Sequence, residues 1–164
     1  MKVKLCMVGA YAVGKTSLVE RFVHSIYSDR YHTTIGVKID TKDVVTPRGS
    51  ANCVIWDIAG EDEFHTVRSS YLRGMRGYLL VIDGTRRVTV EVAQGVHDRI
   101  CATFGPVPFV LLANKADLAD AWELRDDDLD ALRSEALAVR ETSALTGACV
   151  EEAFELLVEA ILDD

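Results

Sequence analysis

Residues 9–16 of the chain read GAYAVGKT, which fits the pattern GxxxxGK[ST] of a phosphate-binding loop. The glycines let the backbone wrap around a phosphate chain, so that successive N–H groups point at the anion. Lys15 adds a positive charge for the outer phosphates, and the Thr16 hydroxyl is a ligand suited to Mg²⁺. The loop is therefore predicted to bind nucleotide phosphates through Tyr11, Ala12, Val13, Gly14, Lys15, Thr16 and Ser17.

A second motif indicates which base is bound. Residues 114–117 read NKAD and follow the apolar run VLLA, so Asn114 stands where a buried strand ends. A carboxylate at Asp117 can accept hydrogen bonds from guanine N1–H and from its exocyclic amine, a donor pair that adenine lacks. The Lys115 stem can lie over the base. These residues predict a guanine site and disfavour an ATP-using enzyme.

Two further loops complete the candidate site. Residues 57–60, DIAG, also end an apolar run. A carboxylate at Asp57 can reach Mg²⁺ through water, and the Gly60 N–H can hold a γ-phosphate. The loop containing Ser143, Ala144 and Leu145 is a weak signal by itself, but its backbone could donate to the guanine carbonyl.

Short apolar runs alternate with helical patterns along the chain, which predicts an α/β fold with a mostly parallel sheet. The expected strands cover residues 2–8, 53–58, 78–83, 109–114 and 138–142. Apolar residues at helical spacing are Val92, Val96 and Ile100, and then Val150, Phe154, Leu157 and Ile161. Residues 36–45 alternate weakly and lead through the turn sequence TPRGS, which predicts a hairpin with one antiparallel edge strand. Residues 126–128, DDD, are expected to form the solvated first turn of a helix.

Composition excludes some classes of partner. The chain has 164 residues, enough for one domain, and a net charge of −8 from 18 basic and 26 acidic side chains. This balance argues against binding to nucleic acid or to an anionic membrane. No apolar run reaches the roughly 18 residues of a membrane span. With Lys2 instead of glycine and no terminal cysteine, we expect a cytoplasmic protein without a stable membrane anchor. Four widely spaced cysteines, expected to be reduced, are Cys6, Cys53, Cys101 and Cys149.

With these motifs in this order, the whole chain resembles the small GTPases of the Ras superfamily. The resemblance implies one GTP-binding domain over residues 1–164, of the P-loop NTPase class, with a six-stranded, mostly parallel sheet, one antiparallel edge strand and helices on both faces. It implies a molecular switch that hydrolyses GTP to GDP and phosphate with Mg²⁺. Thr16 and Asp57 would then bind Mg²⁺, and Thr34 would join them only when GTP is bound. Tyr27 would stack on the guanine edge, and Tyr31 would close over the phosphates.

Within that superfamily, residues 34–37, TIGV, and 69–74, SSYLRG, look most like Rab proteins. Ile39, Trp56 and Tyr71 fall where Rab proteins carry an effector-facing aromatic cluster, although an aromatic residue is usual at position 39. The resemblance implies that effectors, exchange proteins and activating proteins read switch I, about residues 27–37, and switch II, about residues 59–75. The missing cysteine tail favours a prokaryotic Ras-like GTPase.

Two departures from the family pattern concern catalysis. Tyr11 and Ala12 replace the glycines that Ras carries inside the loop, and Glu61 stands where a water-positioning glutamine is usual. We expect Lys15 and Gly60 to stabilise the phosphates and Glu61 to orient or activate water. Arg30 or a group from a partner are the alternatives to Glu61. Because an ionised glutamate can only accept hydrogen bonds, a GTP-loaded interaction module with little hydrolysis stays open as a second hypothesis.

Overall fold

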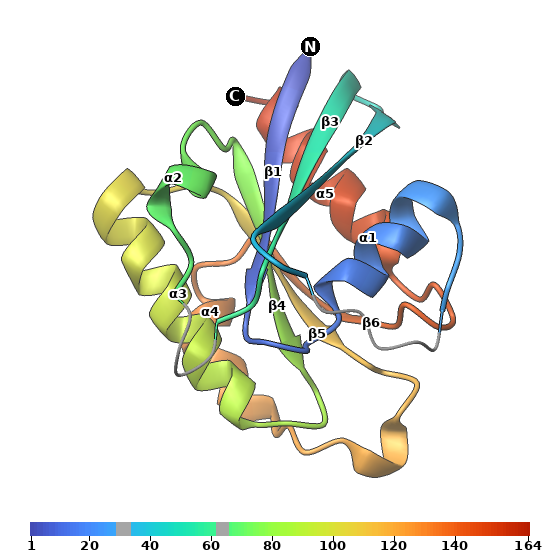
Figure 1. The fold of residues 1–164 in the computed structure, drawn as a ribbon, viewed down its shortest axis with the longest axis vertical. Helices are drawn as coiled ribbons and strands as arrows, with labels where there is room; N and C mark the ends of the chain where they lie inside the picture. The colour runs from blue at the N-terminus through green and yellow to red at the C-terminus, as the bar shows by residue number, and fades with distance from the viewer. Residues whose placement is uncertain (29–33, 62–65) are drawn as a thin grey trace.

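The computed structural model describes residues 1–28, 34–61 and 66–164 of the chain (Figure 1). Over these residues the sheet has six strands in the order β2-β3-β1-β4-β5-β6. The strands are β1 (Lys2–Gly9), β2 (Val37–Thr46), β3 (Gly49–Ile58), β4 (Gly77–Asp83), β5 (Phe109–Asn114) and β6 (Ala138–Thr142). The α-helices are α1 (Lys15–His24), α2 (Ser69–Leu72), α3 (Val88–Phe104), α4 (Asp130–Arg133) and α5 (Val150–Leu162), and the 3-10 helices are η1 (Ala119–Ala121) and η2 (Asp126–Leu129).

Helices cover both faces of the sheet, as Figure 1 shows, and each face has its own hydrophobic core. On one face, Phe22 of α1 and Phe154 of α5 stack with their ring centroids 3.8 Å apart. On the other face, α2, α3 and α4 contribute Leu72, Ile100 and Leu132 to the second core. Because successive side chains of a strand point to opposite faces and helices cover both faces, every residue of β4 and β5 is buried. The predicted α/β class with a mostly parallel sheet is confirmed.

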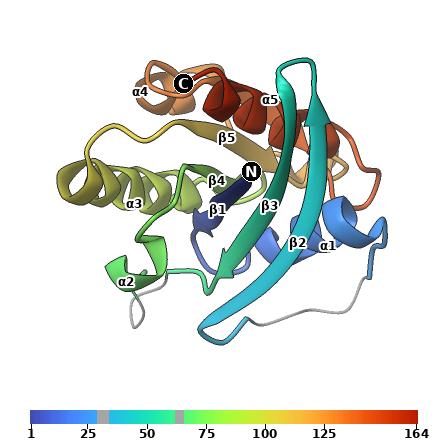
Figure 2. The same cartoon turned by 90° about the horizontal axis from the view of Figure 1, so that it is seen from above.

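The β2–β3 hairpin is the only antiparallel pair among the described strands. Its register runs from Thr46 opposite Gly49 at the turn to Val37 opposite Ile58 at the far end, and Figure 2 shows the two strands side by side. Beyond that end, the Ala59 N–H donates to the Gly36 carbonyl at 2.9 Å. The hairpin therefore joins the start of switch II directly to the end of switch I.

The sequence placed most strand boundaries to within one residue but misjudged one by four residues. Strand β3 begins at Gly49, not at Cys53, because the turn is tight and pairing resumes immediately opposite Thr46. Residues 126–128 form the 3-10 helix η2 that precedes α4, and the Arg125 N–H donates to the Asp128 carboxylate at 2.8 Å. The acidic run therefore does begin a helical segment, although its first turn is of the tighter 3-10 type.

All four cysteines are free thiols, and Cys6 and Cys53 are buried in the strands that contain them. Burial raises the pKa of both, to about 12 for Cys6 and about 11 for Cys53, so both behave as small apolar residues. Among the helices of the described segments, none combines the length and the apolar character that crossing a bilayer requires.

Candidate nucleotide and magnesium site

The predicted site residues meet at one edge of the sheet. Strands β1, β3, β5 and β6 run parallel to one another, and the motif residues stand at their carboxyl ends: Gly9, Asp57, Asn114 and Thr142. In open α/β sheets this edge is where ligands bind, because the loops that leave the strands converge there. The fold thus brings together motifs that lie a hundred residues apart in the sequence.

The phosphate-binding loop runs from the end of β1 into α1, and residues of the base-recognition motif, 114–117, donate hydrogen bonds to it. Asn114 Nδ2 donates to the Val13 carbonyl at 2.9 Å, and Lys115 Nζ donates to the Ala12 carbonyl at 3.2 Å. Gly14 has φ 98°, and a Cβ there would lie 2.4 Å from Asn114 Nδ2. Only glycine accommodates both this backbone angle and this approach.

Lys15 is buried, and its Nζ donates to the Ala10 carbonyl at 3.0 Å. Burial lowers the Lys15 pKa from 10.5 to about 8, while the negative charges of Asp57 and Glu61 oppose that shift. A phosphate chain in the loop would supply further negative charge beside the ammonium group. Lys15 is thus a desolvated cation placed where an anion would stabilise it.

Ala12 carries backbone strain at the centre of the loop. Its φ is 62°, in the left-handed region that is costly for any residue with a Cβ. This is the position at which the Ras-like pattern has glycine. Tyr11, the neighbouring replacement, is more than a third exposed, and its carbonyl accepts a hydrogen bond from Arg86 Nη1 at 3.1 Å.

The base-recognition loops form one hydrogen-bonded unit. The Ser143 hydroxyl donates to the Asp117 carboxylate at 2.8 Å, and the Thr142 hydroxyl donates to Asn114 Oδ1 at 3.1 Å. Ser143 and Ala144 are buried, whereas Leu145 is exposed. The Asp117 carboxylate is exposed with one oxygen engaged by Ser143, which leaves acceptor capacity for a base.

Three oxygen-bearing side chains meet beside the phosphate-binding loop. The Thr16 hydroxyl donates to Asp57 Oδ2 at 2.6 Å and lies 2.5 Å from the Thr34 hydroxyl. Within the described segments, the buried Asp57 Oδ1 has no hydrogen-bond partner. Burial raises the Asp57 pKa, and the Thr16 hydrogen bond and the Lys15 charge oppose that shift. An unpartnered buried carboxylate oxygen with two hydroxyls is the donor set that Mg²⁺ takes, so these residues fit the ion.

Gly60 packs directly against the phosphate-binding loop. A Cβ at this position would lie 2.5 Å from Tyr11 Cα and 2.6 Å from the Ala10 carbonyl oxygen. Next to it, the Glu61 N–H donates to the Gly9 carbonyl at 3.0 Å, and the Glu61 carbonyl accepts from the Tyr11 N–H at 2.8 Å. The backbone of switch II is thereby tied to the end of β1.

The Glu61 side chain reaches a residue of α3. Its carboxylate forms an ion pair with Arg99 and accepts the Val67 N–H at 3.0 Å. The Glu61 side chain is only 10% exposed, whereas the Arg99 side chain is 50% exposed. In this arrangement both contacts fall on one carboxylate oxygen, Oε1.

Some predicted residues fall outside this geometry. Arg30 and Tyr31 lie outside the described residues, and Tyr27 is exposed at the end of the segment that precedes them.

The expected effector-facing cluster does assemble, because Ile39 pairs across the hairpin with Trp56. The Trp56 and Tyr71 rings lie 6.5 Å apart.

Sequence reasoning missed two charged residues. Asp83 is fully buried at the end of β4, and its carboxylate pairs with Lys115 Nζ at 2.8 Å. Its place at a strand end, like that of Asp57, could have revealed it. Arg99 lies in the middle of α3 and carries no local pattern, so only the fold brings it to Glu61.

Comparison with known proteins agrees with this geometry. The Ras family model matches residues 4–163. Rab-25 of Homo sapiens is 34% identical over 163 residues, covering 96% of this chain and 75% of that protein. Rab-32A of Dictyostelium discoideum is 36% identical over 169 residues, covering 97% and 77% of the two chains. Rab-7b of Homo sapiens is 32% identical over 163 residues, covering 97% and 82%.

These similarities confirm the predicted resemblance and favour a hydrolysing switch over an interaction module that retains its GTP. The match extends over nearly the whole chain, so it includes every loop of the site described above. The chain belongs to the Ras family and is a Rab-like small GTPase, a GTP-binding molecular switch that hydrolyses GTP.

Proposed function

We propose that the chain binds GTP and GDP together with Mg²⁺ as one domain over residues 1–164, and that the nucleotide state is read by protein partners. The observation that carries this proposal is the meeting of Thr16, Asp57 and Thr34 beside Lys15. These oxygens come from the phosphate-binding loop, from the end of β3 and from switch I. Mg²⁺ bound with GTP would use all three oxygens and so order switch I, whereas Thr34 would be released in the GDP state.

Each part of the nucleotide has its own contacts in this proposal. The N–H groups of residues 11–17 and the Lys15 ammonium hold the phosphates. Asp117 accepts from guanine N1–H and the exocyclic amine, with Ser143 orienting its carboxylate. The backbone of Ser143, Ala144 and Leu145 faces the guanine carbonyl, and Tyr27 and Tyr31 cover the base edge and the phosphates. Bound Mg²⁺, held by Thr16, Thr34 and Asp57, supplies charge neutralisation at the phosphates.

Hydrolysis in this proposal uses residues of the loop and of switch II. Lys15 stabilises the charge that develops on the transferred phosphoryl group, and the Gly60 N–H donates to it. Glu61 accepts a hydrogen bond from the attacking water and so orients it. Arg99 and the Val67 N–H, which both contact Oε1, compete with the water for this carboxylate.

Effectors and regulators would contact the two switches and the surface formed by Ile39, Trp56 and Tyr71. This surface is continuous with switch I through β2, and the neighbouring Ile35 is 90% exposed. The free cysteines support a cytoplasmic location, because a reducing compartment keeps thiols unpaired.

Single-turnover hydrolysis of bound GTP tests the proposal. Wild type should release phosphate only with Mg²⁺ present, and a hundredfold excess of GTP, but not of ATP, should displace labelled GDP. Lys15→Ala should weaken nucleotide binding by about tenfold to a hundredfold, through loss of a charge-assisted contact. As the control, Lys2→Ala on the exposed first residue of β1 should change nothing. Displacement by ATP as effective as by GTP would contradict the assignment of Asp117.

A further inference from the structure

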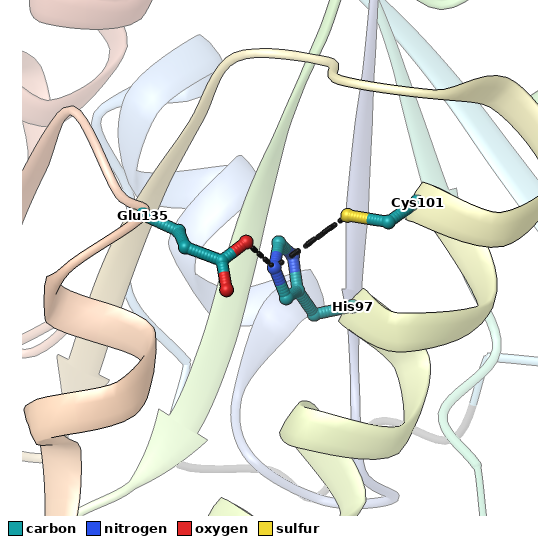
Figure 3. A group of neighbouring side chains, drawn as sticks. All are labelled: His97, Cys101 and Glu135. Carbon is teal, nitrogen blue, oxygen red and sulfur yellow. Dashed lines mark hydrogen bonds and ion pairs between the residues drawn. The ribbon is translucent and has the colours of Figure 1, made fainter.

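Two buried side chains outside the magnesium site, His97 and Asp83, differ in where their contacts lead. Figure 3 shows the His97 ring between the Glu135 carboxylate and the Cys101 thiol. The ring Nδ1 lies 2.6 Å from the Tyr78 hydroxyl and Nε2 lies 2.7 Å from Glu135 Oε2, so both nitrogens are satisfied inside that network. Asp83, by contrast, contacts side chains that reach the phosphate-binding loop.

The two carboxylate oxygens of Asp83 have different partners. Oδ1 accepts the Thr85 N–H at 2.9 Å and the Thr85 hydroxyl at 2.7 Å, which fixes the turn after β4. Oδ2 lies 2.8 Å from Lys115 Nζ and 3.8 Å from Arg86 Nη1. Because the Asp83 side chain is fully buried, water screens its attraction for these two cations less than it would at the surface. Asp83 therefore holds both cations beside the end of β4.

Both cations also donate to carbonyls of the phosphate-binding loop. Arg86 Nη1 donates to the Tyr11 carbonyl at 3.1 Å, and Lys115 Nζ donates to the Ala12 carbonyl at 3.2 Å. The next carbonyl along the loop accepts from Asn114 Nδ2 at 2.9 Å. Three successive carbonyls are therefore held by side chains that stand at the end of β5 or directly after β4 and β5.

Holding these carbonyls directs the N–H groups of the loop. In a trans peptide, the C=O of one residue and the N–H of the next point in opposite directions, and the loop peptides are trans. Donors behind the carbonyls of residues 11 and 12 therefore turn the N–H groups of residues 12 and 13 to the opposite side, where they can bind a phosphate. Ala12, whose φ is 62°, lies between the two held carbonyls, so these contacts also stabilise its left-handed conformation.

We infer that Asp83 and Arg86 are positioning residues for nucleotide binding, which hold the phosphate-binding loop in the shape that retains GDP and GTP. The inference rests on the proposed function, because it concerns how tightly that site keeps its nucleotide. Asp83 acts through Lys115 and Arg86 and does not touch the phosphates itself. Loss of these contacts should let the loop relax and release GDP faster.

Release of fluorescently labelled GDP into excess unlabelled GDP, with Mg²⁺ present, tests this inference. Asp83→Asn keeps an acceptor for Thr85 but removes the charge that holds both cations, and it should speed release about tenfold to a hundredfold. Arg86→Ala removes one partly exposed contact and should speed release about two- to fivefold. Because Asp83 acts partly through Arg86, the double variant should release GDP less fast than the product of the two single effects predicts.

Two controls separate positioning from general stability. Thr85→Val removes the hydroxyl contact to Oδ1 and leaves both cations in place, so it should lower the Tm yet release GDP at the wild-type rate. Arg87→Ala, at the next position, where the side chain is 48% exposed against 41% for Arg86, should also release GDP at the wild-type rate.

The outcomes separate this inference from the proposed function. A wild-type release rate in Asp83→Asn or in Arg86→Ala would remove that residue from the positioning role, and Arg86→Ala decides even where Asp83→Asn fails to fold. Release from Thr85→Val as fast as from Asp83→Asn would overturn the inference and leave Asp83 as a residue of the turn alone. Failure of wild type to bind labelled GDP would instead overturn the proposed function, and the inference with it.

Discussion

Replacing Arg99 with alanine should accelerate GTP hydrolysis. In the structure, Arg99 and the Val67 N–H together hold the Glu61 carboxylate against α3. If Glu61 orients the attacking water, the two contacts at its Oε1 compete with that role, and the fraction of molecules in which they are open limits the rate. Removing Arg99 leaves only the backbone contact, so a larger fraction of Glu61 becomes available.

The size of the effect follows from the exposure of the pair. Because half of the Arg99 side chain is exposed, solvent screens the interaction, and pairs of this kind contribute about 0.5–1 kcal/mol. At about 1.4 kcal/mol for each factor of ten, single-turnover hydrolysis in Arg99→Ala should rise about two- to fivefold. The Val67 N–H contact remains in Arg99→Ala, so the hydrolysis rate should rise less than it would if both contacts to Glu61 were lost.

A matched control is available at the start of the same helix, α3. Arg87 pairs with Asp128, with side-chain exposures of 48% and 14% that resemble those of Arg99 and Glu61. Arg87→Ala should therefore hydrolyse GTP at the wild-type rate. Glu61→Ala should be slower than wild type, and adding Arg99→Ala to it should change nothing further. A rate in Arg99→Ala equal to or below that of wild type would refute the reasoning.

Three other substitutions test the site. Ala12→Gly should stabilise the GDP-bound protein against urea by up to about 1 kcal/mol. Glycine relieves the left-handed strain of about 1–2 kcal/mol, which exceeds the cost of its added entropy in the unfolded chain. As the control, Ala10→Gly, outside the left-handed conformation, should destabilise the protein. Asp117→Asn should weaken GTP binding by about tenfold to a hundredfold and improve binding of xanthosine triphosphate, and equal GTP affinities in a competition assay would contradict the assignment. Asp57→Asn should raise the Tm in EDTA, because it removes the charge of a buried carboxylate whose Oδ1 has no hydrogen-bond partner among the described residues, a cost of about 1–3 kcal/mol. It should nevertheless weaken Mg²⁺-dependent GTP binding, and a change of the same sign in both measurements would remove Asp57 from the metal site.

The sequence predicted the fold well because its signals are local and repeated. Buried parallel strands such as β5 are continuous apolar runs, and Asn114 marks the end of one of them. The loop at Gly14 and the motif at Asp117 have fixed spacings, so their meeting at one edge follows from parallel strands alone. The start of β3 was missed because Gly49 and Ser50 have turn-like types, whereas cross-strand pairing decides where a strand begins.

The orientation of side chains in the site could not be predicted in this way. Glu61 was expected to orient or activate water, and nothing near it in sequence indicates that it also pairs with Arg99, 38 positions further on. The same holds for His97, whose spacing along α3 is that of a core residue and whose contacts with Tyr78 and Glu135 depend on packing. Residue types identify a site, whereas long-range contacts decide which atoms are free to act in it.

The β2–β3 hairpin also has a mechanical consequence. Its ten-residue strands are paired along their whole length, from Thr46 and Gly49 to Val37 and Ile58, and the last hydrogen bond joins Gly36 to Ala59. A fully hydrogen-bonded hairpin resists sliding of one strand along the other. A displacement of the end of switch I is therefore transmitted to the start of switch II directly, and not through the nucleotide. A partner that binds only one switch therefore applies force to both, and the end of switch I moves together with the start of switch II.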